Sequence, residues 1–416
     1  MLLLALVCSC ASPNSDEGGV DASSSSTTDD PSTESGTAET ETETGGEPDQ
    51  PVWLATWSAS PQDANPIAAP AFDIEDQSLR QIAHVSLGGA EVRVRLANTF
   101  GEADLPVAAA RLALSAGGAA IEPGSDRPLS VDGSTVFVIP AGSIVVSDPV
   151  TLDVPALADL SLSLYFDASV STTTVHAEAQ QTTWLVDGDL SAEPSWPTMA
   201  STSTSSYWFN AIEILAPPGA ATIVALGDSI TDGSGSTLGA NHRWPDLLAQ
   251  RLQANAATAD VAVVNAGIGG NCVLRDFIGP RALDRFERDV LDQPGVAWVV
   301  ITEGINDIGV GSILGQPVTA EQLIDGYLEL IEEAHARGLL VYGGTLLPYA
   351  GADYFTEEGE LVRQAVNAWI RDGGAYDAVV DFDAATRDPE AQDRLLAAYD
   401  SGDHLHPSDA VYAAMA

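Results

Sequence analysis

The second half of the chain alternates short apolar runs with longer stretches of helical periodicity. The apolar runs predict strands at 222–226, 261–264, 297–301, 339–343 and 378–381. The amphipathic stretches predict helices at 243–254, 281–291, 320–337 and 357–372, and a last helix is expected to begin near Ser408. Alternation of this kind demands parallel strands joined by right-handed crossovers. We therefore expect a three-layer αβα domain over residues 221–416.

Polar loops that contain glycine follow several of these predicted strands. They are Gly227-Asp-Ser229, 265–271, 302–307 and, after an irregular stretch, 400–407. In an open parallel sheet the ligand crevice lies at the carboxyl ends of the strands. Glycine in these loops also allows backbone N–H groups to approach a ligand closely. The four loops therefore predict one site at a single edge of the sheet.

The first loop permits three interpretations when it is taken alone. Ser229, delivered by an apolar strand, has the place of a nucleophile. The same turn could instead hold a phosphate group or only cap a helix. A serine nucleophile also needs a base, an acid that orients the base, and donors for an oxyanion. The other loops contain residues of these types.

The four loops resemble the sequence blocks of the SGNH hydrolases, also called the GDSL esterase/lipase superfamily. The matching stretches are Gly227-Asp-Ser-Ile-Thr-Asp-Gly233, Ile268-Gly-Gly-Asn271, Gly304-Ile-Asn-Asp307 and Asp403-His-Leu-His406. Gly269, where many members carry Ser, and Val411, where Gly is common, depart from the pattern. The resemblance covers about residue 220 to the C-terminus. It implies a flavodoxin-like αβα hydrolase domain. The whole chain, with its β-rich front half, is similar to secreted bacterial members that have a preceding β-domain.

The resemblance implies a Ser–His–Asp triad. Ser229 would be the nucleophile, His406 its general base, and Asp403 the acid that fixes the tautomer of His406. The structural alternative is a polar turn before the last helix, with Asp403 as a local cap. His404 is a rival base, but its place directly beside Asp403 does not match the family pattern. We therefore assign His404 to the surface or to substrate contact.

The resemblance also implies an oxyanion hole, which stabilises the negative oxygen of a tetrahedral intermediate. Its donors would be the backbone N–H groups of Ser229 and Gly270 and the side-chain amide of Asn306. Gly269 replaces Gly270 if the second block aligns one residue earlier. For Asn306 the structural alternative is an Asx-turn.

Other polar residues are interpreted as structural. His84 and His176 lack metal-ligand spacing to an acidic or cysteine partner, and His242 and His335 are expected in exposed positions. Turn or cap roles are expected for Asp228, Asp232 and Asp307, and a packed position for Cys272. The predicted reaction needs no metal and no cofactor.

Residues 51–216 show strand periodicity without helical periodicity. Alternation is clearest in 91–96 and 160–166, and about eight short strands predict an all-β sandwich-like accessory domain. Its aromatic residues are expected mainly in the core, with a sugar-stacking platform as the alternative. They are Trp53, Trp57, Trp184, Trp196, Tyr207 and Trp208. The Pro-Pro-Gly stretch at 217–219 marks the boundary.

The N-terminal segment predicts export. Residues 1–12 resemble the end of a secretory signal with a bacterial lipobox, in which Cys10 would be lipidated. An ordinary signal peptide cut nearby is the alternative, and the missing basic region points to a start upstream of Met1. Residues 13–50 are acidic and rich in Ser and Thr, so they predict a disordered linker. We expect a secreted or cell-envelope protein whose membrane contact is the lipid anchor alone.

The charge balance excludes one class of partner. The chain has 16 basic residues, all of them Arg, against 60 acidic residues, and its net charge is −44. Such a surface repels nucleic acid and anionic membranes. No feature of the sequence indicates an oligomeric state.

The predicted function is that of a serine ester hydrolase that acts on short-chain or acetyl esters, such as acetylated carbohydrate. No long apolar lid is evident in the sequence, and this favours a short acyl group. One alternative is a catalytically inactive surface lipoprotein that binds carbohydrate through its β-domain. Another is a phosphate- or nucleotide-binding domain, which the absence of Lys and the acidic balance disfavour.

Overall fold

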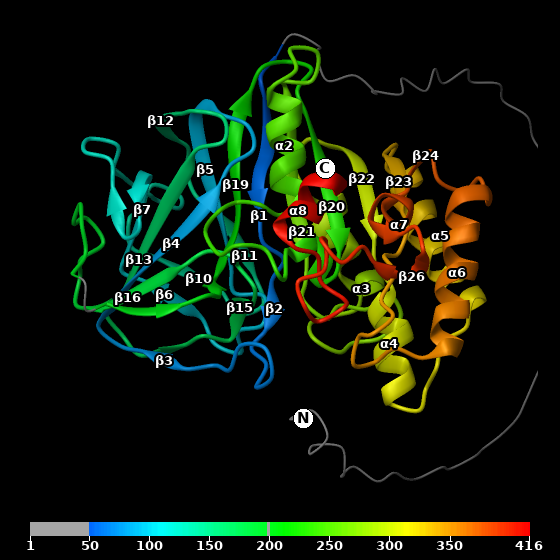
Figure 1. The fold of residues 1–416 in the computed structure, drawn as a ribbon. Helices are drawn as coiled ribbons and strands as arrows, with labels where there is room; N and C mark the ends of the chain where they lie inside the picture. Colours follow the sequence, from blue (N-terminus) through cyan, green and yellow to red (C-terminus); the bar gives the residue numbers. More distant parts are fainter. Residues whose placement is uncertain (1–49, 198–199) are drawn as a thin grey trace, which may run out of the picture. The chain divides into compact units, whose positions relative to one another are not determined.

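The computed structural model describes residues 50–197 and 200–416. The predicted signal segment 1–12, the lipidation site Cys10, and the predicted linker apart from its last residue lie outside the described residues. Two regions follow each other along the described chain (Figure 1). We call the part from β1 to β19 the β-rich region and the part from β20 to α8 the α/β region.

The β-rich region is built mainly from two antiparallel sheets, ordered β1-β19-β5-β11 with β12 beside β5, and β17-β16-β4-β13-β7-β8 with β9 beside β7. The first sheet comprises Val52–Ser58 (β1), Gly89–Ala97 (β5), Ile144–Val146 (β11), Val150–Val154 (β12) and Phe209–Ala216 (β19). The second comprises Gln77–His84 (β4), Ala109–Gly117 (β7), Ala120–Ile121 (β8), Arg127–Pro128 (β9), Asp159–Phe166 (β13), Thr183–Asp187 (β16) and Ser201–Ser203 (β17). Smaller ladders are formed by Gln62–Asp63 (β2), Asp73–Ile74 (β3), Leu105–Val107 (β6), Phe137–Ile139 (β10), Val170–Ser171 (β14), Thr174–His176 (β15) and Ser206–Tyr207 (β18).

One hydrophobic core lies between the two sheets. Alternate residues of β5 and β13 point into it, among them Val92, Val94, Leu162 and Leu164, which are fully buried. The sandwich expected from this alternation is confirmed. Most of the aromatic residues are core residues, as predicted, because Trp57, Trp196, Tyr207 and Trp208 are buried whereas Trp53 and Trp184 are partly exposed.

The α/β region contains five parallel strands in the order β21-β20-β22-β23-β24. They are Ala221–Gly227 (β20), Val261–Gly267 (β21), Val296–Thr302 (β22), Leu340–Gly344 (β23) and Ala378–Val380 (β24). This is the flavodoxin-like order, so the predicted fold class is confirmed. Gly227 at the end of β20 pairs with Gly267 of β21 and Thr302 of β22. The loops that follow these three strands therefore start side by side.

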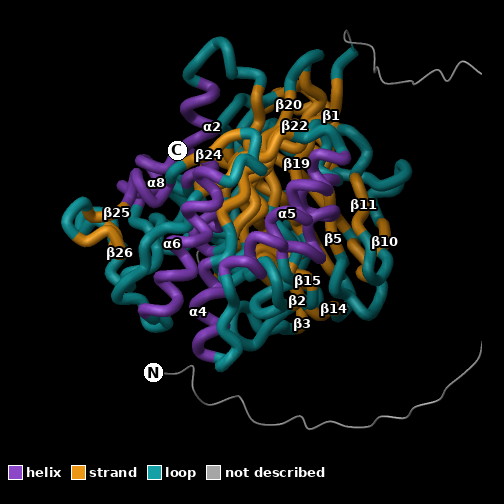
Figure 2. The backbone as a smooth tube through the Cα atoms, turned by 90° about the vertical axis from the view of Figure 1, so that its right-hand side faces the viewer, coloured by secondary structure: helices purple, strands orange, loops and turns teal. Residues whose placement is uncertain are grey.

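Helices cover both faces of this sheet (Figure 2). One face carries Trp244–Gln253 (α2), Phe382–Thr386 (α7) and Asp409–Met415 (α8), and packs on Ala225. The other carries Ala282–Phe286 (α3), the π-helical turn Glu287–Leu291 (η1), Ile305–Ile313 (α4), Ala320–Ala336 (α5) and Glu357–Asp372 (α6), and packs on Val224 and Leu226. The short elements are Ser229–Asp232 (α1), Arg387–Asp388 (β25) and Ala391–Leu395 (β26).

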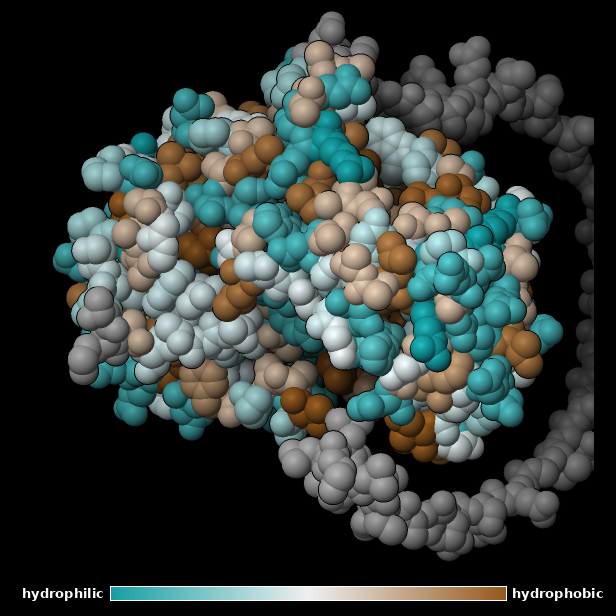
Figure 3. Space-filling model, in the orientation of Figure 1, coloured by the Kyte–Doolittle hydropathy of each residue, from teal (hydrophilic) through white to brown (hydrophobic). Residues whose placement is uncertain are grey.

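The two regions are joined by buried hydrogen bonds. Thr222 Oγ1 donates to the carbonyl of Ala55 (3.0 Å), and Ser58 Oγ donates to the carbonyl of Asn265 (2.9 Å). Together they form one compact unit. On the face drawn in Figure 3, hydrophobic residues lie in patches among hydrophilic ones. None of the helices in residues 50–197 and 200–416 combines the length and apolar character needed to cross a membrane.

Candidate active site

Ser229 lies at the tight turn between β20 and α1. The turn requires Gly227, because a Cβ atom there would lie 2.2 Å from Thr231 Oγ1 and 2.5 Å from the Thr302 carbonyl oxygen. Asp228 caps α1, since its Oδ1 accepts the N–H of Ile230 at 2.9 Å. The cap predicted for Asp228 is confirmed. Ser229 is 5% exposed, at the carboxyl edge of the sheet.

Ser229, His406 and Asp403 form a continuous chain of hydrogen bonds. Ser229 Oγ lies 2.8 Å from His406 Nε2, and His406 Nδ1 lies 2.6 Å from Asp403 Oδ2. The carboxylate accepts a proton from Nδ1, which leaves Nε2 to accept the serine hydroxyl. Asp403 Oδ1 also accepts the backbone N–H groups of Leu405 (3.0 Å) and His406 (2.8 Å). Asp403 therefore both orients His406 and stabilises its own loop.

The charges and hydrogen bonds around these three residues favour a charged Asp403 and a basic His406. Burial alone would raise the pKa of Asp403, but hydrogen bonds from His406 and from two backbone N–H groups hold it well below its usual range. Burial alone would lower the pKa of His406, but the hydrogen bond and charge of Asp403, together with Glu178 and Asp228, raise it. His406 is thus suited to take a proton from Ser229.

The loop after β21 holds the two glycines that were alternatives for the oxyanion hole. The Gly269 N–H donates to Asp232 Oδ2 at 3.0 Å. The N–H of Gly270 donates to no acceptor among the described residues. Gly270 has φ +74°, and a Cβ atom there would lie 2.8 Å from Cδ1 of Ile278. Of the two N–H groups, that of Gly270 is therefore the one available to a ligand.

Asn306 lies in the first turn of α4 and is 4% exposed. Its amide nitrogen donates to the carbonyl of Asn271 (2.9 Å), and its oxygen accepts from the Tyr354 hydroxyl (3.3 Å). The amide nitrogen keeps a second hydrogen for a ligand. Because its oxygen bonds Tyr354 and no nearby backbone N–H among the described residues, Asn306 does not form the Asx-turn that was the alternative.

A buried arginine on α3 connects the loops of the site. Arg285 is 1% exposed and donates to the carbonyl oxygens of Gly227 (3.0 Å) and Ala266 (2.7 Å) and to Asn271 Oδ1 (2.9 Å). Its charge is balanced by Asp289, at 3.2 Å. The guanidinium therefore links the ends of β20 and β21 to the loop that carries Gly270.

Three buried carboxyls lie behind the site. Burial raises the pKa of Asp228 to about 7 and that of Asp307 to about 6, and it raises the pKa of Glu303 well above its usual range. Asp307 accepts the N–H groups of Val273 (2.7 Å) and Leu274 (3.0 Å), so it holds the loop after β21 and does not cap a helix as had been expected. These contacts also link α4 to the loop of residues 268–274 after β21, which we call the oxyanion loop.

The comparisons with known proteins concern the α/β region. Residues 225–414 match the model of the GDSL-like lipase/acylhydrolase family. This part of the chain is a GDSL-like lipase/acylhydrolase domain. We call it the GDSL domain from here on.

Two solved structures illustrate the similarity. An acetyl xylan esterase from Geobacillus stearothermophilus is 25% identical, and the match covers 47% of this chain and 90% of that one, with a TM-score of 0.37. A GDSL-like lipase from Bacteroides thetaiotaomicron is 22% identical, with coverage of 47% and 83% and a TM-score of 0.35. Among curated proteins, none matches this chain.

Two residues beside the GDSL domain's loops were missed as site residues. His176, interpreted as structural, bonds Asp232 (3.0 Å), and Asp232 accepts the Gly269 N–H where a cap had been expected. Glu178 accepts the hydroxyl of Ser234 and fills the space where Gly269 lacks a side chain. Both residues come from the β-rich region, so no pattern local to the GDSL domain indicates them.

The other histidines lie outside the hydrogen-bonded chain of Ser229. His404 bonds Asp400 and has a half-exposed side chain, as a surface or substrate-contact residue requires. His242 and His335 pair with Asp409 and Asp377 and are also exposed to solvent, as expected. Cys272 is fully buried and free. Within residues 50–197 and 200–416, no cluster of His, Cys, Asp and Glu has metal-ligand geometry.

Proposed function

We propose that the protein hydrolyses carboxylic esters through an acyl intermediate on Ser229. The observation that carries the proposal is the hydrogen-bonded chain from Ser229 through His406 to Asp403. A serine hydroxyl is a weak nucleophile until a neighbouring base removes its proton, and Nε2 of His406, the proposed base, lies 2.8 Å from Ser229 Oγ.

In the first half of the reaction, Ser229 Oγ attacks the ester carbonyl while His406 Nε2 takes the hydroxyl proton. Asp403 stabilises the imidazolium that forms. His406 then protonates the departing alcohol, and the acyl group stays on Ser229. In the second half, a water molecule loses a proton to His406 and attacks the acyl carbon, which releases the carboxylic acid and restores the serine.

The developing oxyanion would be stabilised by the N–H groups of Ser229 and Gly270 and by the Asn306 amide. The available N–H of Gly270 and the second hydrogen of the Asn306 amide support this assignment. The position of Ser229 at the start of α1 adds a backbone N–H at the same edge of the sheet.

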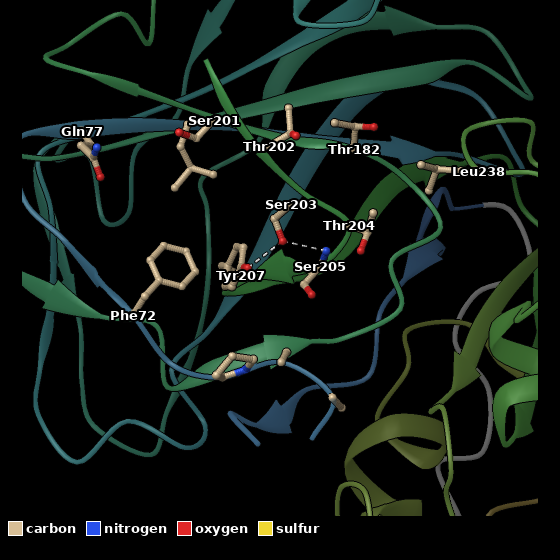
Figure 4. A pocket seen from close by; sticks show the side chains of 14 residues that line it. Phe72, Gln77, Thr182, Ser201, Thr202, Ser203, Thr204, Ser205, Tyr207 and Leu238 are labelled. Atoms are coloured by element: carbon tan, nitrogen blue, oxygen red, sulfur yellow. Dashed lines mark hydrogen bonds between the residues drawn. The ribbon is translucent and has the colours of Figure 1, made fainter. Parts of the chain in front are cut away.

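For the substrate we propose a short-chain or acetyl ester with a hydroxyl-rich alcohol part, such as acetylated carbohydrate. A cavity of about 730 Å³ in the β-rich region supports this class (Figure 4). Its lining combines Phe72 and Tyr207 with the hydroxyl side chains of Thr182 and residues 201–205. The partly exposed Phe72 ring and the hydroxyl groups offer the apolar and polar contacts that a sugar ring can use, whereas Tyr207 is a buried core residue.

The segment that follows α1 has residues near both His406 and the cavity. Gly235 packs against His406 and Pro407, and Leu238, three residues later, lines the cavity. None of the proposed triad and oxyanion residues lines this cavity, so it supports the substrate class as a binding surface apart from Ser229. The same cavity is the feature that favours the second candidate, a carbohydrate-binding protein without catalysis.

The test is hydrolysis of p-nitrophenyl acetate by the purified protein and by Ser229→Ala, with fluorophosphonate labelling mapped by mass spectrometry. We expect turnover and a label on Ser229, and both should be lost in the variant. A folded protein that shows neither turnover nor label would contradict the esterase proposal. Binding of a xylo-oligosaccharide by such a protein would then support the second candidate.

A further inference from the structure

His176 is a buried residue at the end of β15, and both nitrogens of its ring form hydrogen bonds. Its Nδ1 lies 3.1 Å from the carbonyl oxygen of Ser60, and its Nε2 lies 3.0 Å from Asp232 Oδ1. A carbonyl oxygen and a carboxylate oxygen both accept hydrogen bonds. His176 therefore donates from both ring nitrogens, and this is the pattern of an imidazolium paired with a carboxylate.

The charges around His176 agree with that pattern. Burial alone would lower the pKa of His176, but the charge of Asp232 and the hydrogen bonds to Asp232 and Ser60 raise it, against the opposing charge of Arg243. Arg243 is itself paired with Asp246, at 2.8 Å. Because Arg243 pairs with Asp246, the carboxylate of Asp232 is left to pair with His176.

Asp232 connects His176 to the oxyanion loop through its two carboxylate oxygens. Its second oxygen, Oδ2, accepts the Gly269 N–H at 3.0 Å, and the residue is fully buried at the end of α1. The loop also packs closely on α1, because a Cβ atom on Gly267 would lie 2.3 Å from the Asp232 nitrogen. The next N–H along the chain is that of Gly270, the proposed oxyanion donor.

We propose that His176 and Asp232 are positioning residues that aim the N–H of Gly270 at the substrate's oxyanion. This inference rests on the proposed ester hydrolysis. His176 belongs to the β-rich region, so that region would complete the catalytic site of the GDSL domain. An oxyanion donor acts only when it is held in place before charge develops, and two buried hydrogen bonds supply that rigidity.

The alternative is that the pair merely tethers the two regions. A tether would change stability and leave turnover by the folded protein unchanged. A positioning pair would lower kcat and the affinity for a transition-state analogue by the same factor, while KM stays nearly constant. The two roles therefore differ in a measurement that is independent of stability.

His84 offers a matched control. It is another histidine of the β-rich region that bonds an aspartate, Asp159, at 2.7 Å. Its ring also lies 3.0 Å from the Asn241 amide of the GDSL domain, and its side-chain hydrogen bonds within the described residues go to Asp159 and Asn241, not to the oxyanion loop. His84→Gln therefore removes a histidine at the boundary and leaves the loop of Gly269 intact.

The experiment compares the full-length wild type, His176→Ala, His176→Gln, Asp232→Asn and His84→Gln. Each is assayed for hydrolysis of p-nitrophenyl acetate, inhibition by phenylboronic acid, which forms a tetrahedral serine adduct, and thermal unfolding. We expect His176→Ala to lower kcat and boronate affinity by about 30-fold or more, with KM within about threefold. His176→Gln, whose amide can donate to Asp232, should recover at least about fivefold of the loss in kcat. His84→Gln should keep kcat within about twofold.

The outcomes separate the two proposals. A wild type without turnover would refute the ester hydrolase and this inference together. An active wild type whose folded His176→Ala keeps its kcat and boronate affinity would refute only the positioning role. If His176→Ala does not fold, Asp232→Asn, which keeps the side-chain volume, decides the question: a shared loss of kcat and boronate affinity supports the positioning role, and an unchanged kcat and affinity refute it.

Discussion

His406 Nδ1 lies 2.6 Å from Asp403 Oδ2, a residue only three positions earlier in the same loop. The base and the group that orients it are thus held by one turn of backbone, closed by hydrogen bonds from the N–H groups of Leu405 and His406 to Asp403. This closeness makes the orientation of His406 a local property of the loop.

We expect Asp403→Asn to lower kcat for p-nitrophenyl acetate by about 10² to 10⁴, because the amide favours the wrong tautomer of His406. Ser401→Ala is the control, since the Ser401 hydroxyl donates to the same carboxylate at 3.1 Å, whereas the bond of Ser401 to His406 is made by the backbone and is kept in the variant. Steady-state kinetics on both folded variants checks this. Equal effects of the two changes would contradict the role of Asp403.

The pH profile should report the raised pKa of His406. Ser229 can be activated only when His406 is neutral, so kcat/KM should rise with pH and reach half its plateau above pH 6.5, the ordinary value for histidine. Glu178→Gln removes one of the charges that raise this pKa, and the midpoint should move to lower pH. The exposed Glu102→Gln should leave the midpoint unchanged. A midpoint that Glu178→Gln does not move would refute the electrostatic role.

Removal of the Asn306 amide should lower kcat and leave substrate binding nearly intact. Asn306→Ala is expected to lower kcat by about 10² to 10³, or roughly 3–4 kcal/mol of transition-state stabilisation, with little change in KM. Tyr354→Phe is the control, since it removes only the hydroxyl that bonds the Asn306 oxygen. A loss confined to KM would instead place Asn306 in ground-state binding.

Glu303 should make the fold less stable as the pH rises. Its pKa is raised in the folded protein, so the folded state keeps a proton that the unfolded state releases above about pH 4.5. Stability should therefore fall above that pH, by at most about 1.4 kcal/mol per pH unit. Glu303→Gln removes this dependence.

Urea unfolding at pH 5 and pH 8 measures the effect of Glu303. Glu303→Gln should gain stability relative to wild type at pH 8 more than at pH 5. The exposed Glu332→Gln of α5 should give the same difference from wild type at both values. An equal effect of Glu303→Gln at both pH values would contradict the buried, protonated carboxyl.

Local patterns were sufficient to predict the sheet, whereas the residues of the candidate triad came from the family resemblance. The apolar runs around Val224 and Val264 mark strands because a parallel sheet is buried on both faces. The loops after these strands meet because Gly227 and Gly267 are in register. The hydrogen bonds of Ser229 are observed, whereas its catalytic role stays a prediction.

Other features depend on tertiary packing and were not predictable from local patterns. Helix α4 contains Gly309 and Gly311, which weaken a helical pattern, and its stability comes from burial. The contacts of His176 and Glu178 depend on how the β-rich region packs against residues far along the chain. Arg285 resembles any other charge in an amphipathic helix until the strand ends surround it.

The bond between His176 and Asp232 has a consequence for how such a chain can evolve. A catalytic domain that carries its whole site can be recombined with new partners by exchange of gene segments. Here the junction at 217–219 resembles a place to cut, but a cut there would leave Asp232 with no histidine to pair. We expect the two regions to be inherited together, and natural or engineered shuffling of the β-rich region to succeed only where the donor also supplies that histidine.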